Sequence, residues 1–290
     1  LNNINYLKLC IKSIKDNSKL NHEIIVHVNN DNDGTIKFLK KDNIKFSQTN
    51  YNAGICEGVN LAAKLSTTNY FLYAHDDMYF CPNWDQSLLN ELNSLNHNKF
   101  YLSGTMIEPN SGHIIFNCGE NIDNFDERKL LNEYKKMKFY DFQGSTWAPH
   151  LIHKELWNKV GGFSEEYFPG TGSDPDLNMK LWQQGIRIFK GINDFKIYHF
   201  GSVVLRKKLN LIKNKNKYGS RASKLFLLKW GISIKFFKRF YLRSNEKYEG
   251  PLSEPVINLY YLINLFTCKI YYFYLLIFYK KLFKNFTLNK

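Results

Sequence analysis

Residues 70–78, Tyr-Phe-Leu-Tyr-Ala-His-Asp-Asp-Met, place two adjacent carboxylates directly after a short run of mainly apolar residues. The run, Tyr70–Ala74, has the length and composition of one buried strand. Asp76 and Asp77 repel each other and resist burial, but a divalent cation shared with a diphosphate would remove that cost. A solvent-exposed turn explains the same residues equally well, so both interpretations stay open on this stretch alone.

The segments around this strand alternate between patterns typical of strands and of helices. Glu23–Val28 is a β-branched run that predicts a buried strand, and residues 52–65 predict a helix ahead of the Tyr70–Ala74 strand. Pro82–Asn83 then opens a leucine-rich helix. This alternation predicts an α/β fold whose mostly parallel sheet is flanked by helices. Ligands of such sheets bind beyond the carboxyl ends of the strands, where the acid pair lies.

A second acidic cluster occupies residues 171–176, Thr-Gly-Ser-Asp-Pro-Asp. Asp174 directly before Pro175, with Gly185 further on, predicts a helix that has Asp174 as its N-cap. A carboxylate at a helix N-terminus stays ionised at neutral pH, as a general base must. Capping alone would explain Asp174, but the Gly170–Gly172 loop before it would let the backbone lie close to a ligand.

In their order and spacing these segments resemble the inverting glycosyltransferases of family 2, over about residues 4–205. The acid pair is similar to the family's DxD-type step, with His75 at its first acidic position. Residues 28–35 resemble the turn after the family's second strand, and residues 156–168 resemble the segment before its Glu-Asp motif. The resemblance implies a GT-A (Rossmann-like) domain truncated before its first strand, a nucleotide-diphosphate sugar as donor, and a divalent cation, Mn²⁺ or Mg²⁺, as cofactor.

The resemblance also implies roles for single acidic and basic residues. Asp174 inherits the position of the general base, and Asp176 a supporting position. Asp77 would hold the metal ion, with Asp76 near the ribose or the metal. His199 resembles the late histidine that completes the metal site, although a lone histidine after a strand is more often structural.

For the nucleotide, the resemblance implies Asn30 at the position of a base-contacting Asp, together with Asn52, Gly54 and Asn60 at the start of the helix that follows. Trp147 is a candidate to stack on an acceptor sugar, with a core aromatic as an equal alternative. The expected activity is metal-dependent hexosyl transfer to a hydroxyl of a glycan or lipid-linked acceptor.

The excess positive charge of the chain lies entirely in its last third. Residues 201–290 hold 19 Lys and Arg against 3 Asp and Glu, so this segment carries +16 while the whole chain carries +14. Such a segment suits an anionic partner, namely a membrane surface, a lipid-linked phosphate or a nucleic acid. We therefore divide the chain into a GT-A domain over residues 1–205 and a basic helical extension over residues 206–290.

Residues 256–279 of this extension are nearly all apolar, with Lys269 near the centre. A surface-bound helix, a helix packed on the catalytic domain and a spanning helix all remain open. A central lysine and many tyrosines favour the interfacial position. The prediction is a cytoplasmic enzyme of polysaccharide biosynthesis at the inner face of the membrane, with peripheral contact through residues 206–290.

Other features narrow the remaining alternatives. The five cysteines lack a CxxC motif and regular spacing, which predicts reduced thiols without a disulfide framework or a zinc site. The chain opens without a secretory signal, inside what reads as a helix, so we expect a fragment.

A non-catalytic GT-A relative that binds sugar nucleotide or glycan remains an alternative. A nucleic-acid-binding protein using residues 206–243 ranks lower, because it leaves both acidic clusters unexplained, and we expect no nucleic-acid partner.

Overall fold

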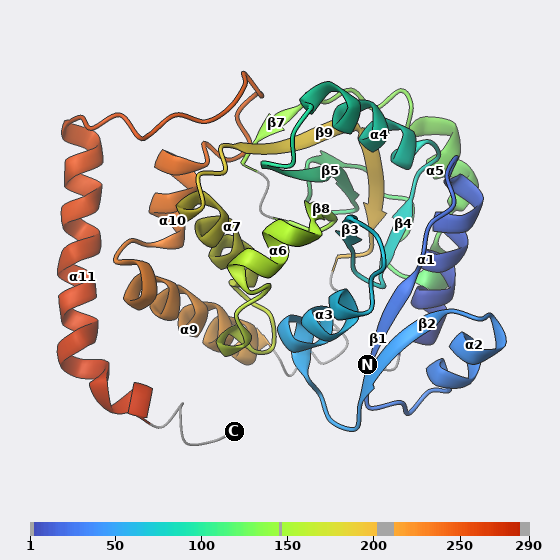
Figure 1. The fold of residues 1–290 in the computed structure, drawn as a ribbon, viewed down its shortest axis with the longest axis horizontal. Helices are drawn as coiled ribbons and strands as arrows, with labels where there is room; N and C mark the ends of the chain where they lie inside the picture. Colours follow the sequence, from blue (N-terminus) through green and yellow to red (C-terminus); the bar gives the residue numbers. More distant parts are fainter. Residues whose placement is uncertain (1–2, 145–146, 202–211, 285–290) are drawn as a thin grey trace.

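The computed structural model describes residues 3–144, 147–201 and 212–284, with side chains from residue 221 to residue 277 in the last of these ranges. Figure 1 shows a body of strands and helices, with helices from the last third of the chain set beside it. The strands are β1 (Ile25–Asn29), β2 (Lys45–Thr49), β3 (Tyr70–Tyr73), β4 (Met78–Phe80), β5 (Phe100–Glu108), β6 (Ile114–Ile115), β7 (Phe142–Gln143), β8 (His150–His153) and β9 (Ile188–His199).

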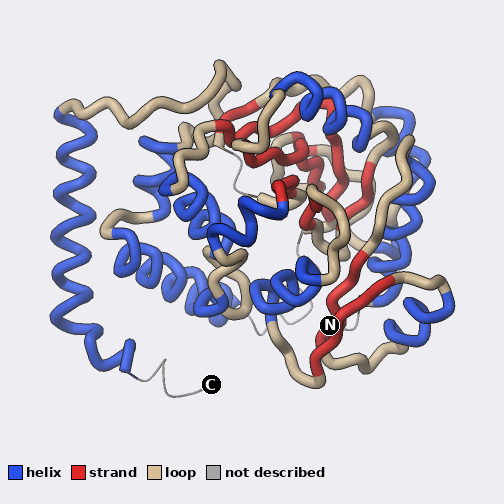
Figure 2. Tube along the Cα trace, in the orientation of Figure 1, coloured by secondary structure: helices blue, strands red, loops and turns tan. Residues whose placement is uncertain are grey.

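The helices of the body are α1 (Ile4–Asn17), α2 (Thr35–Lys41), α3 (Gly54–Lys64), α4 (Trp84–Leu95), α5 (Glu127–Glu133), α6 (Lys154–Val160) and α7 (Ser173–Gln183), with 3-10 turns η1 (Ile122–Asn124) and η2 (Glu165–Tyr167). The extension holds α9 (Ile212–Trp230), α10 (Ile234–Phe236), the π-helical turn η4 (Phe237–Tyr241) and α11 (Leu259–Lys284). Figure 2 shows the strands gathered in the body and the extension as helices joined by loops.

The strands form one mixed sheet of seven strands and a separate parallel pair. In the large sheet the order is β3-β8-β5-β9-β4, with β6 paired to β5 and β7 to β9, while β1 pairs with β2. β5 and β9 are parallel, whereas β8 is antiparallel to both of its neighbours and β4 is antiparallel to β9. The predicted α/β fold is confirmed, but the sheet is mixed rather than mostly parallel. The alternation of apolar segments reveals which residues form strands and not the direction in which each strand enters the sheet.

The register of the sheet brings three strand ends together. In the parallel pair β5–β9, Ile107 lies opposite Tyr198, so Glu108 and His199 end neighbouring strands. Met78, the first residue of β4, lies opposite His199 on the other side of β9. The acid pair therefore enters β4 directly beside the carboxyl ends of β5 and β9, which is the edge where ligands of α/β sheets bind.

The extension packs into the core of the body. One cluster of buried residues contains Tyr101 and Ile152 of the sheet together with Phe226, Phe237 and Leu242 of the extension. The division at residue 205 therefore separates two parts of the sequence that share a core. All five cysteines are free and buried, so the chain contains no disulfide.

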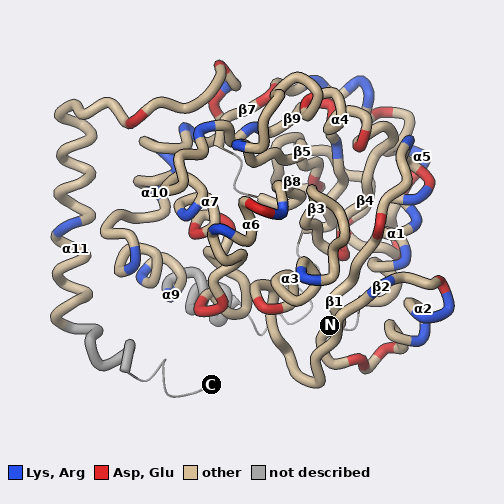
Figure 3. The backbone as a smooth tube through the Cα atoms, in the orientation of Figure 1, with Lys and Arg blue, Asp and Glu red and all other residues tan. Residues whose placement is uncertain are grey.

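Helix α11 lies on the outside of the molecule (Figure 1) and carries almost no charged positions over its described part (Figure 3). By length and composition its segment Leu259–Ile277 could cross a membrane. Tyr261, Cys268 and Leu275 are buried against the rest of the extension. The opposite face is exposed, so the helix is apolar on both sides.

Candidate active site

Two histidines and one acid meet at the end of β9. The ligand atoms of His75, Asp77 and His199 all lie within 4.8 Å of one another. Asp77 and His199 are each about 5% exposed. The short segment between β3 and β4 positions His75 and Asp77, and pairing of Met78 with His199 brings the third group alongside. Such a group, with one carboxylate and two imidazoles, has the composition of a metal site.

Glu108 orients His199 and was not predicted from the sequence. His199 Nδ1 lies 2.5 Å from Glu108 Oε1, while His199 Nε2 lies 3.3 Å from Asp77 Oδ1. Burial alone would lower the pKa of His199. Asp77 and Glu108 outweigh this effect through their hydrogen bonds to the imidazole and through their charges, and they raise the pKa to about 9. The two acids therefore favour a positive charge at this imidazole, whether from a proton or from a metal ion.

The residues present fit a divalent cation. His199 Nε2 is buried and faces Asp77 Oδ1 at 3.3 Å, within the group formed with Asp77 and His75. Metal-ligating histidines commonly hydrogen-bond a carboxylate through the other ring nitrogen, as His199 does with Glu108. Because Mg²⁺ prefers oxygen ligands, two imidazoles beside one carboxylate favour a transition-metal ion over Mg²⁺.

Asp76 does not point into this group. Its Oδ2 accepts a hydrogen bond of 3.2 Å from Asn3 Nδ2 at the start of α1. Burial and the neighbouring charge of Asp77 raise the pKa of Asp76 to about 6. The structure thus gives His75, and not Asp76, the third position beside Asp77 and His199. A ribose contact by Asp76 stays a prediction.

Asp174 lies in the first turn of α7. The prediction that Asp174 is the N-cap is wrong: α7 begins at Ser173, and its N-cap is Gly172 with φ +84°. Ser173 Oγ donates a 2.7 Å hydrogen bond to Gly170 O, which helps the helix begin two residues earlier than expected. Asp174 Oδ1 is 3.5 Å from the buried His150 Nε2, and the Asp174 side chain is about a quarter exposed (26%).

Common neighbours show that the two acidic clusters converge. Burial lowers the pKa of His75, and the charges of both Asp77 and Asp174 raise it. Burial raises the pKa of Tyr73, and the same two charges raise it further. The Tyr73 ring lies 5.4 Å from the His75 ring and 6.3 Å from the His150 ring. A row of three neighbouring side chains, His75, Tyr73 and His150, therefore joins Asp77 to Asp174.

The residues predicted to contact the nucleotide lie in the turns after β1 and β2 and in α3. Asn30 is exposed, with its backbone N–H bonded to Thr49, and Asn52 is exposed with its side chain accepting from Gly54 N. Asn60 has another role here: its amide donates to Phe163 O and accepts from Phe163 N, both at 2.9 Å. Both ends of the Asn60 amide are hydrogen-bonded to the backbone of Phe163. This geometry favours a role in positioning the loop that contains Phe163, and not a contact with the nucleotide.

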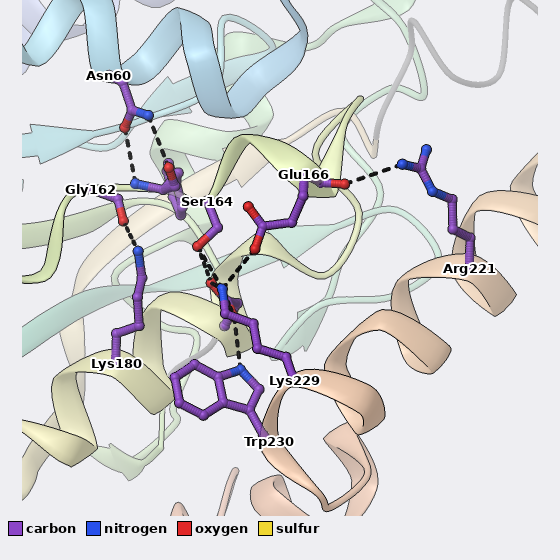
Figure 4. A network of polar contacts seen from close by, with 10 residues as sticks. Asn60, Gly162, Ser164, Glu166, Lys180, Arg221, Lys229 and Trp230 are labelled. Atoms are coloured by element: carbon purple, nitrogen blue, oxygen red, sulfur yellow. Dashed lines mark hydrogen bonds and ion pairs between the residues drawn. The ribbon is translucent and has the colours of Figure 1, made fainter. Parts of the chain in front are cut away.

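Asp176 holds the extension in place. Figure 4 shows the surrounding network of polar contacts, in which Ser164, Glu166, Lys229 and Trp230 are labelled. Asp176 is fully buried and receives hydrogen bonds from Ser164 Oγ at 2.6 Å and Trp230 Nε1 at 2.8 Å, with an ion pair to Lys229 at 3.0 Å. Lys229 also pairs with Glu166 at 2.8 Å. Asp176 therefore supports the packing of α9 on α7.

Trp147 is 41% exposed, so it is not a core aromatic. Its ring lies 5.5 Å from the His113 ring, and the Lys238 ammonium lies 5.7 Å from its centroid. Burial lowers the pKa values of His113 and Lys238. The charge of Glu108 opposes this effect at His113, and the charge of Asp174 opposes it at Lys238. Trp147 thus lies on a path of neighbouring side chains that joins the histidine–acid group to Asp174.

Several solved structures have a similar fold at low sequence identity. The crystal structure of S. aureus TarS matches with a TM-score of 0.54 at 15% identity, over 79% of this chain and 38% of that chain. The crystal structure of TarS residues 1–349 matches with a TM-score of 0.51 at 16% identity, over 68% of this chain and 57% of that chain. The crystal structure of GalNAc-T7 with UDP, GalNAc and Mn²⁺ matches with a TM-score of 0.51 over 67% of this chain and 40% of that chain, at 14% identity. The chain thus spans less than two thirds of each of these proteins.

These likenesses establish the GT-A fold, which was predicted. No curated protein matches the sequence. The family model for Glycosyl transferase family 2 matches residues 1–154, which is more than half of the chain. This match includes the acid pair, Glu108 and His150, and the chain therefore belongs to glycosyl transferase family 2.

Proposed function

We propose that the protein is a metal-dependent, inverting glycosyltransferase of the hexosyl type. It moves a sugar from a nucleotide-diphosphate donor to a hydroxyl group of a glycan or lipid-linked acceptor. The observation that carries this proposal is the convergence of the His75–Asp77–His199 group with Asp174. A metal-type group and a separate, partly exposed carboxylate are what displacement of a diphosphate by a hydroxyl requires.

In the proposed reaction the acceptor hydroxyl attacks the anomeric carbon from the face opposite the diphosphate. Asp174 accepts the hydroxyl proton as the new bond forms, and His150 Nε2 lies 3.5 Å from its carboxylate. Asp77, His199 and His75 would hold the cation, which when bound stabilises negative charge on the leaving diphosphate. Glu108 keeps the His199 ring oriented through its Nδ1.

The donor is most simply a UDP-sugar with Mn²⁺. TarS residues 1–349 have been crystallised with UDP-GlcNAc, and GalNAc-T7 with UDP, GalNAc and Mn²⁺. The two imidazoles at the cation site are consistent with Mn²⁺. Asn30 and Asn52, which lie in turns, and Gly54, the first residue of α3, remain candidates for nucleotide contact.

The test is transfer by the full chain from a panel of UDP-, GDP- and dTDP-sugars, with Mn²⁺ or with EDTA. Release of the nucleoside diphosphate and formation of a glycosylated product are measured together. We expect turnover with one nucleotide class, lost in EDTA. Tight, Mn²⁺-dependent binding of a sugar nucleotide without release of the diphosphate would instead identify a non-catalytic relative, and absence of both would refute the proposal.

We also propose that the outer face of α11 contacts a membrane surface, which would place the enzyme at the cytoplasmic face of a bilayer. Large apolar side chains recur at helical spacing along this face, and each is about half exposed or more: Leu259, Ile263, Phe266, Ile270, Phe273 and Ile277. The Lys269 ammonium lies beside Gly231, on the protein side of the helix. An apolar face of this kind, next to a basic segment, is typical of interfacial helices.

Flotation with liposomes tests the membrane contact. Substituting Ile263→Asp together with Ile270→Asp changes only the exposed face, so the packed face keeps Tyr261 and Cys268. We expect the wild-type chain to float with vesicles containing anionic lipid and the double variant to stay at the bottom. Equal flotation of both, with thermal stability unchanged, would contradict the contact through α11.

A further inference from the structure

Lys238 reaches the candidate active site from the extension. It lies in the π-helical turn η4, whose neighbouring residue Phe237 is fully buried. The Lys238 side chain is half-buried, and its ammonium lies 5.7 Å from the Trp147 ring centroid. Arg239, the next residue, is exposed and lies over Tyr260 of α11. Wide π-turns are frequent at functional sites, and this one directs one cation inward and the next outward.

The segment after η4 fixes the backbone of Lys238 against the body. Ser244 N donates a 3.0 Å hydrogen bond to Lys238 O, and Ser244 Oγ donates one of 3.0 Å to Gly144 O. Gly144 has φ +65°, and a Cβ at this position would collide with Leu242. The backbone of Gln143 is also paired with the extension, through Asn245 N. The backbone of Lys238 is therefore connected through Ser244 to Gly144, three residues before Trp147 in the sequence.

The charge of Lys238 is only partly compensated within the protein. Over the part of the chain that the structure describes, no carboxylate lies within ion-pair distance of its ammonium. Burial lowers the pKa of Lys238, and only the charge of Asp174 opposes this effect. A half-buried ammonium without a paired acid is costly, and an anionic ligand would relieve the cost.

We propose that Lys238 and Trp147 form an acceptor subsite beside Asp174 for a sugar that carries an anionic group, either a phosphate or a carboxylate. The proposal rests on the proposed function, because it assigns the acceptor to the Asp174 side. The Trp147 ring offers an apolar face to the sugar, and the Lys238 ammonium pairs with its anionic oxygen. The donor diphosphate belongs at Asp77 and His199.

Three matched probes test the subsite on the full chain: glucose, glucuronic acid and glucose 6-phosphate. They share one ring and differ at C6, which carries a hydroxyl, a carboxylate or a phosphate. Binding to the wild-type chain is measured by ligand-observed NMR in the presence of UDP and diamagnetic Mg²⁺ in place of Mn²⁺. We expect at least one anionic probe to bind about tenfold or more tightly than glucose, since hydrogen bonds to charged groups are the stronger ones. The preferred probe identifies the anion as phosphate or carboxylate.

Lys238→Met should abolish this preference while leaving glucose binding and Mn²⁺-dependent UDP binding unchanged. Lys238→Arg keeps the charge and should keep the preference, which guards against a loss caused by misfolding. Lys235→Met is the matched control, because Lys235 is an exposed lysine three residues away in α10. A wild-type chain without preference for either anionic probe, or a preference that survives Lys238→Met, would overturn the subsite. Loss of UDP binding in the wild-type chain would instead count against the proposed function.

Discussion

Glu108→Gln should weaken Mn²⁺ binding without removing it. Glu108 Oε1 lies 2.5 Å from His199 Nδ1, and Ser111 Oγ donates to the other carboxylate oxygen. Glutamine has nearly the same shape and can still accept a hydrogen bond from His199 Nδ1. The substitution therefore removes the negative charge while retaining the volume and one acceptor. It tests the electrostatic part of the interaction.

The expected size follows from the strengths of the two hydrogen bonds. A bond to a charged group contributes about 1.5–3 kcal/mol and a neutral one about 0.5–1.5 kcal/mol, so the substitution costs about 1–1.5 kcal/mol. That difference corresponds to a roughly tenfold weaker metal affinity. It lies at the lower end of the roughly 10–100-fold losses found when the partner of a metal-bound histidine is changed. Loss of a ligand itself, in Asp77→Asn, should exceed it.

Titration calorimetry with MnCl₂ in the presence of UDP measures this affinity. The matched control is Glu91→Gln, because Glu91 is also an acid of low exposure, but its partner at 2.7 Å is Lys190, away from the metal-type group. The control should destabilise the chain and leave Mn²⁺ binding unchanged. If Glu108→Gln binds Mn²⁺ within twofold of the wild type while Asp77→Asn loses it, Glu108 does not orient a metal ligand and the reasoning fails.

Three further predictions concern α7 and its partners. Asp174→Asn should keep Mn²⁺-dependent UDP binding but slow transfer by about 10²–10⁴-fold, measured by product formation; wild-type turnover would exclude Asp174 as the base. Lys229→Met should lower the free energy of unfolding by about 2–3 kcal/mol in denaturant titrations, because the buried Asp176 loses its ion pair; an unchanged value contradicts this. Burial raises the pKa of Glu166, but Lys229 outweighs it and holds the pKa below 4.5. The stability lost in Glu166→Gln should therefore be present at neutral pH and vanish as the pH falls below 4.5; a loss that persists in acid would argue against the ion pair.

The sequence predicted the elements that depend on local pattern. The Tyr70–Ala74 run became β3, residues 52–65 contain α3, and the acid pair follows its strand as expected. Asp77, His199 and Asp174 were identified from family motifs, and the structure places all three near His75. Strand direction could not be predicted, because an apolar run has the same pattern in a parallel and an antiparallel pair.

Residues whose role depends on pairing between distant strands were missed. Glu108 has no motif around it, and only the register of β5 against β9 places it beside His199. His75 was noted as a departure from the DxD-type step, although its imidazole lies in the metal-type group where the carboxylate of Asp76 was expected. A histidine at the first position of such a step, directly after a buried strand, is a signal that could have identified it.

The first turn of α7 links the extension to the proposed chemistry. Asp174 and Asp176 are two residues apart, so they project from the helix about 200° apart around its axis. One carboxylate is therefore partly exposed beside His150, while the other is fully buried under Lys229 and Trp230. Any loosening of the inner contact lets the start of α7 move, and with it the carboxylate that should accept the proton. Because Lys238 belongs to the same docked segment, the base and the proposed acceptor subsite depend on one attachment, and a chain without its extension should lose both.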